Sequence, residues 1–288
     1  MNTDGLDLTI LGPAFLAGLA VLATHVPLGR EVLRRGIIFL DLAVAQIAGL
    51  GVIAANALLN DAPTGAAQIF ALSAALAGAL LLSACEKRWP DVQEAIIGSA
   101  FVLAASLGLL LLARHPEGGT HLKDLLAGQI LWVDLDQVLV AAAVAIGVIG
   151  GWIIARTRRG RPRITVFYLL FAIAITTSVQ IVGVYLVFAS LVIPALAVRR
   201  FQRGATAWAF GIGVSGYALG LALSGLVDAP AGPLIVLCLA AFGILARLGG
   251  REEVGTRYGV NPITRARQPP GPHARPSARP AVDEQGSP

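Results

Sequence analysis

The stretch "LDQVLVAAAVAIGVIGGWIIA", residues 135–155, decides the fold class, because every residue from 138 to 155 is apolar or glycine. A helix of about 20 residues rises roughly 1.5 Å per residue and so crosses the hydrocarbon core of a bilayer, which is roughly 30 Å thick. The stretch lacks the alternating polar and apolar residues of a barrel strand, and a segment inside a bilayer must satisfy its own backbone hydrogen bonds. It therefore predicts a transmembrane α-helix.

Similar runs recur along almost the whole chain. Hydrophobic residues make up 56% of the 288 residues, charged residues make up 14%, and the mean hydropathy is +0.75. These values exclude a water-soluble domain of average composition. We expect an all-α, polytopic transmembrane helical bundle of about 8–9 spans in residues 1–248. The nine apolar segments are residues 8–24, 36–59, 64–84, 94–113, 135–155, 164–181, 184–198, 205–226 and 231–248.

The last segment of the chain, residues 249–288, has a different composition. It is charged and then Pro- and Arg-rich, as in "RQPPGPHARPSARPAVDEQGSP". Such a composition cannot bury a hydrophobic core, so this segment is expected to be a disordered cytoplasmic tail.

Positive charge is concentrated in alternate connections between the apolar segments. Because cytoplasmic loops carry an excess of Lys and Arg, these connections should face the cytoplasm, with the N-terminus outside and the C-terminus inside a cell (inner) membrane. Only Arg114 and Lys123 lie on the other side before the tail. This topology also explains the pI near 9.8, so no nucleic-acid partner is expected. The thirteen basic residues on the expected cytoplasmic side are Arg30, Arg34, Arg35, Lys87, Arg88, Arg156, Arg158, Arg159, Arg161, Arg163, Arg199, Arg200 and Arg203.

A polar, Gly-rich connection precedes the fifth apolar segment. It ends in a short apolar piece, residues 125–133, which is too short to cross a bilayer and predicts an interfacial or re-entrant helix. His115, Glu117 and His121 in this connection could bind a cation, since imidazole and carboxylate groups suit zinc or manganese. The alternative is that these side chains are only solvated.

Four stretches, taken together, resemble the permease family of bacterial zinc and manganese ABC transporters. Their order and spacing match the family through most of the first 248 residues, and the last of them is similar to the family's closing helix. The stretches are "GREVLRRGIIFLDLAVAQIAGLG" (29–51), "QEAIIGSAFVLAASLGLLLL" (93–112), "LLAGQIL" (125–131) and "VGVYLVFASLVIPALAV" (182–198).

The resemblance implies a permease that pairs as a homodimer, with cytoplasmic ABC ATPase subunits on one side and an extracytoplasmic metal-binding protein on the other. The transported ion would be zinc or manganese, and the chain would hold no cofactor of its own. The sequence contains no GxxxxGK[ST] phosphate-binding loop, so the chain is not expected to be an enzyme, and a partner would hydrolyse ATP.

The second apolar segment departs from the family pattern. Family members carry "GDALSH" there, with an Asp and a His four residues apart on one helix face, whereas this chain has "LDLAVAQ", residues 40–46. Gln46 replaces the His and Asp41 is displaced by one residue. At about 100° per residue these two side chains do not share a face, so they are not assumed to share a ligand. Asp41 is a metal-ligand candidate, but pairing with Arg34 or Arg35 is favoured.

Other polar residues inside the apolar segments are candidates for the translocation path. Gln46 and Asn56 lie on one stripe of their predicted helix. This stripe either lines the path or makes an interhelical hydrogen bond. A second polar group, expected at the outer end of the sixth segment, is formed by Thr176, Thr177 and Gln180; the hydroxyl groups of the two threonines alternatively bond to their own helix.

Further polar and helix-breaking positions have local alternatives. Glu94 opens the fourth segment, where it either stabilises the helix N-terminus or takes part in gating or ATPase contact. The connection between residues 156 and 167 is shorter than in the family and carries arginines, including Arg158 and Arg159, where the family has an acidic stretch that helps to contact the ATPase. Pro194 should kink its helix.

The sequence thus predicts a membrane-spanning permease subunit that moves zinc or manganese by alternating access, powered by a separate ATPase. The alternative is a secondary transporter, or a degenerate permease that does not transport and acts as a scaffold. A secondary transporter needs protonatable groups near the middle of the membrane, and few are recognised in the sequence.

Overall fold

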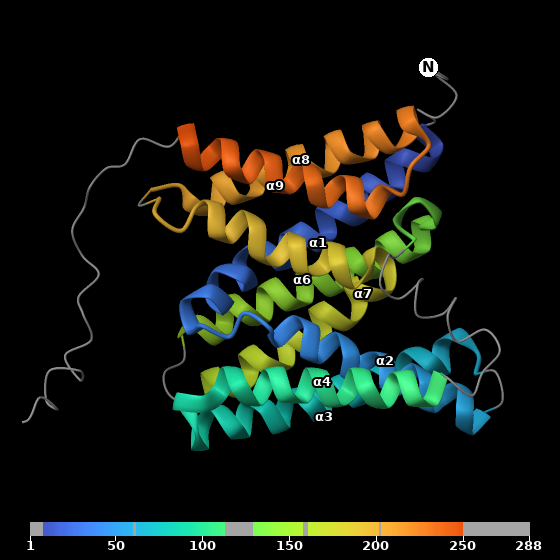
Figure 1. The fold of residues 1–288 in the computed structure, drawn as a ribbon, viewed down its shortest axis with the longest axis vertical. Helices are drawn as coiled ribbons and strands as arrows, with labels where there is room; N and C mark the ends of the chain where they lie inside the picture. Colours follow the sequence, from blue (N-terminus) through green and yellow to red (C-terminus); the bar gives the residue numbers. More distant parts are fainter. Residues whose placement is uncertain (1–7, 60–61, 113–128, 158–160, 202, 250–288) are drawn as a thin grey trace, which may run out of the picture. The chain divides into compact units, whose positions relative to one another are not determined.

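A computed structural model describes residues 8–59, 62–112, 129–157, 161–201 and 203–249, and the described residues form helices without strands (Figure 1). Seven helices are long and apolar enough to cross a membrane, and α2 contains a shorter apolar helix, Leu40–Asn56. The predicted all-α transmembrane bundle is therefore confirmed. The long helices are α1 (Leu8–Arg35), α2 (Leu40–Leu59), α3 (Thr64–Arg88), α4 (Gln93–Leu112), α6 (Leu135–Thr157), α7 (Arg161–Ala197), α8 (Ala205–Val227) and α9 (Ala231–Gly249), with short 3₁₀ turns η2 (Pro90–Val92) and η3 (Ile130–Trp132).

Helix α1 is longer than the apolar segment that predicts it. The segment was expected to end at residue 24, yet the helix continues through Pro27 to Arg35. The polar residues that interrupt the apolar run have partners in the fold, because His25 Nδ1 lies 2.9 Å from the carbonyl oxygen of Val21 and Glu31 is paired with arginines. The helix ends at Gly36, whose φ of 74° is in the left-handed region that glycine adopts readily.

Helix α7 joins two segments that the sequence predicts as separate spans. The backbone leaves helical angles at Gly183, with φ 77° and ψ 164°, a conformation that essentially only glycine adopts. Before the break, Arg163 pairs with Glu31 of α1. After the break, Leu191 meets the neighbouring Gly29 of α1. The two halves therefore run in opposite directions, as two spans would (Figure 1).

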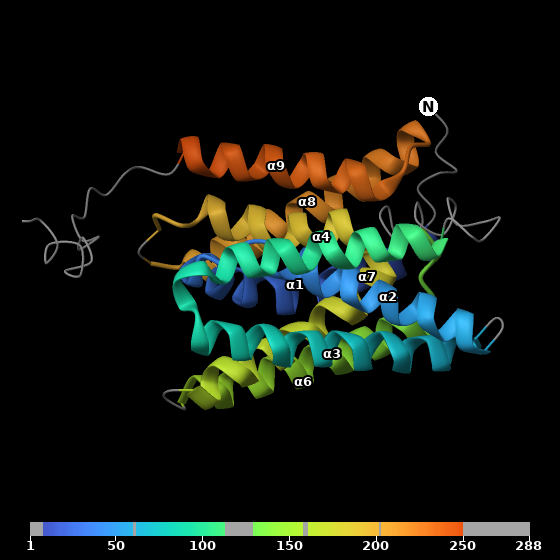
Figure 2. The same ribbon diagram turned by 60° about the horizontal axis from the view of Figure 1, so that its bottom comes forward.

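Helices α1 and α7 form the centre of the bundle. α7 packs against α1, α3, α6 and α9, while α2 packs against α3 and α4, and α8 packs against α9. Figure 2 shows α3 and α6 on one side and α9 on the opposite side of these central helices. The core is built from small and branched apolar residues, and its largest fully buried side chains include Tyr168, Tyr217, Phe167 and Phe171.

The basic residues between the helices gather at one end of the bundle, which we call the arginine end. Contacts across it join Arg35 of α1 to Glu86 of α3, Lys87 of α3 to Thr165 of α7, and Arg30 of α1 to Thr206 of α8. The described part of this end comprises Arg30, Arg34, Arg35, Lys87, Arg88, Arg156, Arg163, Arg199, Arg200 and Arg203. The clustering agrees with the alternation that the charge pattern predicts.

Several sequence predictions fall outside the described residues. These are the tail from residue 250 onward, the candidate metal ligands His115, Glu117 and His121, and the basic residues Arg158 and Arg159. Of the predicted interfacial piece, residues 125–133, the structure describes 129–133, which contain the 3₁₀ turn η3.

Candidate translocation site and the arginine end

The carboxylate of Asp41 is buried in the first turn of α2. The residue is 1% exposed, and neither carboxylate oxygen has a hydrogen-bond partner. The predicted ion pair with Arg34 or Arg35 is therefore wrong. The physical reason is that Glu31 and Glu86 already hold those two guanidinium groups.

Gln46 and Asn56, the two amides of the predicted stripe, are half-buried rather than enclosed. Leu50 and Ile53 lie near the same face of α2 as Gln46, and both approach Gly108 of α4. The stripe therefore borders α4 and reaches the surface of the single chain.

The three polar candidates on α7 differ in their exposure. Thr176 is 1% exposed and its hydroxyl has no partner, Thr177 is half-buried, and Gln180 is exposed. Thr177 lines a cavity of about 10 Å³ between α1, α6 and α7, together with Thr24 and Ser178. A cavity of this size holds about one water molecule, so it is not a channel for a hydrated ion.

His25 is a buried polar residue that the sequence reading missed. It is 0% exposed, its Nδ1 lies 2.9 Å from the carbonyl oxygen of Val21 and 2.9 Å from the hydroxyl of Thr24, and its Nε2 has no partner. Positions 18, 22, 25 and 29 share one face of α1, which packs against α8 at Tyr217 and Gly213 and against α7 at Leu191. The signal was available, because an ionisable residue inside a span is a functional candidate by default.

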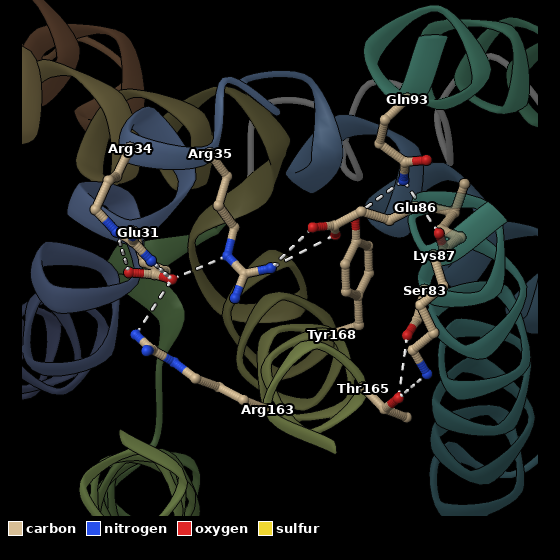
Figure 3. A network of polar contacts seen from close by, with 11 residues as sticks. Glu31, Arg34, Arg35, Ser83, Glu86, Lys87, Gln93, Arg163, Thr165 and Tyr168 are labelled. Carbon is tan, nitrogen blue, oxygen red and sulfur yellow. Dashed lines mark hydrogen bonds and ion pairs between the residues drawn. The ribbon is translucent and has the colours of Figure 1, made fainter. Parts of the chain in front are cut away.

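A network of ion pairs crosses the arginine end (Figure 3). Glu31 accepts hydrogen bonds from Arg34, with Nε at 2.9 Å, and from Arg35, with Nε also at 2.9 Å, and a guanidinium nitrogen of Arg163 lies 3.8 Å away. The other side of Arg35 donates to Glu86 over 3.1 Å. One carboxylate of α1 therefore links this helix to α7 directly and to α3 through Arg35.

Aromatic rings lie against two guanidinium groups of this network, that of Arg35 on α1 and that of Arg163 on α7. Arg35 lies 4.4 Å from the centre of the Phe167 ring, and Arg163 lies 5.9 Å from that of Trp152. The two rings also pack on each other, with centroids 5.5 Å apart. Such cation–π contacts fix the guanidinium planes in a partly desolvated setting.

The dipeptide Gln93–Glu94 at the start of α4 connects three other helices. The Gln93 amide donates to the hydroxyl of Tyr168 on α7 over 2.9 Å and to the carbonyl of Leu82 on α3 over 3.1 Å (Figure 3). Glu94 accepts a hydrogen bond from the backbone N–H of Phe39, just before α2, over 3.2 Å. Glu94 therefore accepts this hydrogen bond from the start of α2 rather than from its own helix.

Pro194 is buried in the second half of α7, and the non-helical backbone lies at Gly183, eleven residues earlier.

Within the described ranges, His, Cys, Asp and Glu side chains form no group of three or more that could hold a metal ion. The described residues of one chain therefore contain no ready-made metal centre. What they contain is separate polar side chains on α2 and on α7, and an ionic cluster at the arginine end.

The family model described as the ABC 3 transport family matches residues 7–159 and 162–249. The chain belongs to the ABC 3 transport family. This match covers the described helices apart from Arg161, the first residue of α7, and it confirms the resemblance drawn from the four sequence stretches.

Curated relatives include transport-system membrane proteins. The chain is 27% identical over 264 residues to the high-affinity zinc uptake system membrane protein ZnuB of Haemophilus influenzae, a match that covers 85% of this chain and 99% of the relative. It is 25% identical over 191 residues to a probable metal transport system membrane protein of Chlamydia muridarum, covering 58% of this chain and 65% of that protein.

Two solved structures share the fold. PsaBC from Streptococcus pneumoniae in complex with Fab gives a TM-score of 0.68 at 21% identity, covering 85% of this chain and 95% of the matched chain. An inward-facing structure described as a metal-chelate type ABC transporter gives a TM-score of 0.61 at 19% identity, covering 81% and 84%. At these identities the likeness concerns the fold.

Proposed function

We propose that the chain is one half of a homodimeric permease that moves a divalent metal ion, zinc or manganese, across a cell membrane between its two copies. Family membership supports the transport role, and the ZnuB relative supports a metal cargo. Separate ATPase subunits provide the energy, and an extracytoplasmic metal-binding protein delivers the ion.

The observation that carries this proposal is the placement of the polar residues in the membrane helices. Gln46 and Asn56 are half-buried and Gln180 is exposed at the surface of one chain. An amide that faces lipid is unfavourable, so such side chains need a polar or protein environment. A second copy packed over them would enclose these side chains, whereas the cavity that Thr177 lines inside one chain holds about one water molecule.

The arginine end is the side proposed to meet the ATPase. Its α3–α4 connection is exposed at Trp89, which is 52% accessible, and at Val92, which is 51% accessible. Gln93, immediately after this turn, bonds to both α3 and α7, so a force applied to the turn would reach those helices. The arginines of residues 156–163 are proposed to contribute to the same contact.

The path assignment is tested by replacing Gln46 with leucine, which removes the amide without adding volume that the bundle cannot accept. Metal uptake per folded molecule should fall at least about tenfold, the factor for a loss of about 1.4 kcal/mol of transition-state stabilisation. Uptake of radioactive zinc and manganese is measured in cells that co-express the ATPase and the binding protein. Ser99→Ala is the matched control, because Ser99 is exposed and bonds to the carbonyl of Ala95 in its own helix.

Two results of this test carry different meanings. If the parent protein takes up metal and Gln46→Leu takes it up equally well, Gln46 does not line the path, and α2 is removed from the proposal. Absence of uptake of either metal by the parent protein, with both partners present, would remove the metal cargo itself.

The proposed orientation predicts which residues are reached from outside the cell. A cysteine at Asp136, exposed in the first turn of α6, should react with a membrane-impermeant maleimide in intact cells, and one at Arg247, exposed in the last turn of α9, should react after permeabilisation. The native Cys85 and Cys238 are replaced by serine and alanine to remove background. The reverse pattern would invert the topology.

A further inference from the structure

The start of α2 lacks the residues that usually cap a helix N-terminus. Phe39 occupies the N-cap position, and its carbonyl already accepts the helical bond from Ala43 over 3.1 Å. A capping side chain is normally Ser, Thr, Asp or Asn. In a capping box, a Glu three residues later bonds back to the N–H of the N-cap residue, but here that position is the apolar Leu42.

Glu94 supplies the missing acceptor from another helix. Its Oε1 accepts the N–H of Phe39 over 3.2 Å, which is the bond that a capping-box glutamate makes within one helix.

The position of Glu94 is itself fixed by the preceding residue. Gln93 is 4% exposed and is held by Tyr168 of α7 and the carbonyl of Leu82 in α3. Adjacent residues therefore reach in two directions, one to α3 and α7 and the other to α2. Gln93 and Glu94 of α4 therefore connect the beginning of α2 to α3 and to the central helix α7.

We propose that Glu94 is a positioning residue for α2, the helix that carries Gln46 and Asn56, and that it acts as a hydrogen-bond acceptor rather than through its charge. A helix advances about 1.5 Å and turns about 100° per residue, so a shift of one residue at the start of α2 would turn Gln46 away from the path. This inference rests on the proposed function for its transport consequence, while the capping itself does not depend on transport.

The test compares Glu94→Gln, which keeps the acceptor and removes the charge, with Glu94→Ala, which removes both. In the purified chain, hydrogen exchange of the peptide that spans residues 37–44 should be about fivefold faster in Glu94→Ala, the factor that follows from losing a helix cap, and unchanged in Glu94→Gln. In cells, Glu94→Ala should lower metal uptake severalfold and Glu94→Gln should restore it. Asp136→Asn is the matched control, since Asp136 is an exposed acidic residue in the first turn of α6.

The outcomes separate the two proposals. If Glu94→Gln is as defective in uptake as Glu94→Ala, the charge is required, and the positioning inference is overturned in favour of gating or ATPase contact. If exchange in residues 37–44 is the same in all variants, the cap does not exist. If exchange changes as expected but the parent protein moves no metal, the capping inference stands and the proposed function fails.

Discussion

Gly29→Ala is expected to destabilise the fold strongly, because an added Cβ would lie 2.0 Å from the carbonyl oxygen of Leu191. The obstructing atom belongs to the backbone of α7, so the clash is relieved only by moving α1 and α7 apart. We expect a loss of about 3 kcal/mol in the free energy of unfolding, at the upper end of the range for overpacking. Gly29 therefore sets the distance between the two central helices near the arginine end.

The measurement is the fraction of protein that remains monodisperse in detergent after heating, for the parent chain, Gly29→Ala and a control. Gly12→Ala is the control, since Gly12 lies in the same helix and its added Cβ would meet nothing within 4 Å. It should be neutral or slightly stabilising, because alanine has the higher helix propensity. Equal stability of Gly29→Ala and Gly12→Ala would show that α1 and α7 are not in close contact there.

The helices were predictable because a bilayer permits few alternatives. The run at 135–155 becomes α6, Leu135–Thr157, with an error of two residues at its end. The end of α1 was misplaced by eleven residues, since a hydropathy reading stops at Thr24 and His25, whereas the fold buries both. Hydropathy records the cost of transferring a side chain to lipid, and it carries no information about a protein neighbour that removes this cost.

The candidate site was less predictable because its contacts join distant segments. The spacing of Glu31, Arg34 and Arg35 already places them on neighbouring turns of one helix. It does not reveal that Glu86 lies beside Arg35, which depends on how α1 and α3 pack. Because the sequence does not show that Glu86 is the partner of Arg35, the predicted ion pair was assigned to Asp41, which is the wrong carboxylate.

Glu31→Gln should destabilise the arginine end by about 2–3 kcal/mol. Removing one partner of a fully buried pair costs about 3–5 kcal/mol, but the side chain of Arg34 is 62% exposed and its pair contributes little. The larger part comes from Arg35, whose side chain is 11% exposed and for which Glu86 would remain as the charged partner among the described residues. Unfolding in denaturant, or the midpoint of heat-induced aggregation in detergent, measures the change.

A double-mutant cycle decides whether the Arg35 contact accounts for this loss. Glu31→Gln, Arg35→Gln and the double variant are compared, and the coupling energy should be about 1–3 kcal/mol, as expected for residues in one ionic network. Arg30→Gln combined with Glu31→Gln is the control, because Arg30 bonds to Thr206 rather than to Glu31 and should show no coupling. Additive effects of Glu31→Gln and Arg35→Gln would show that the carboxylate acts mainly through Arg34 or Arg163. The link from α1 to α3 would then be carried by Arg35 and Glu86 alone.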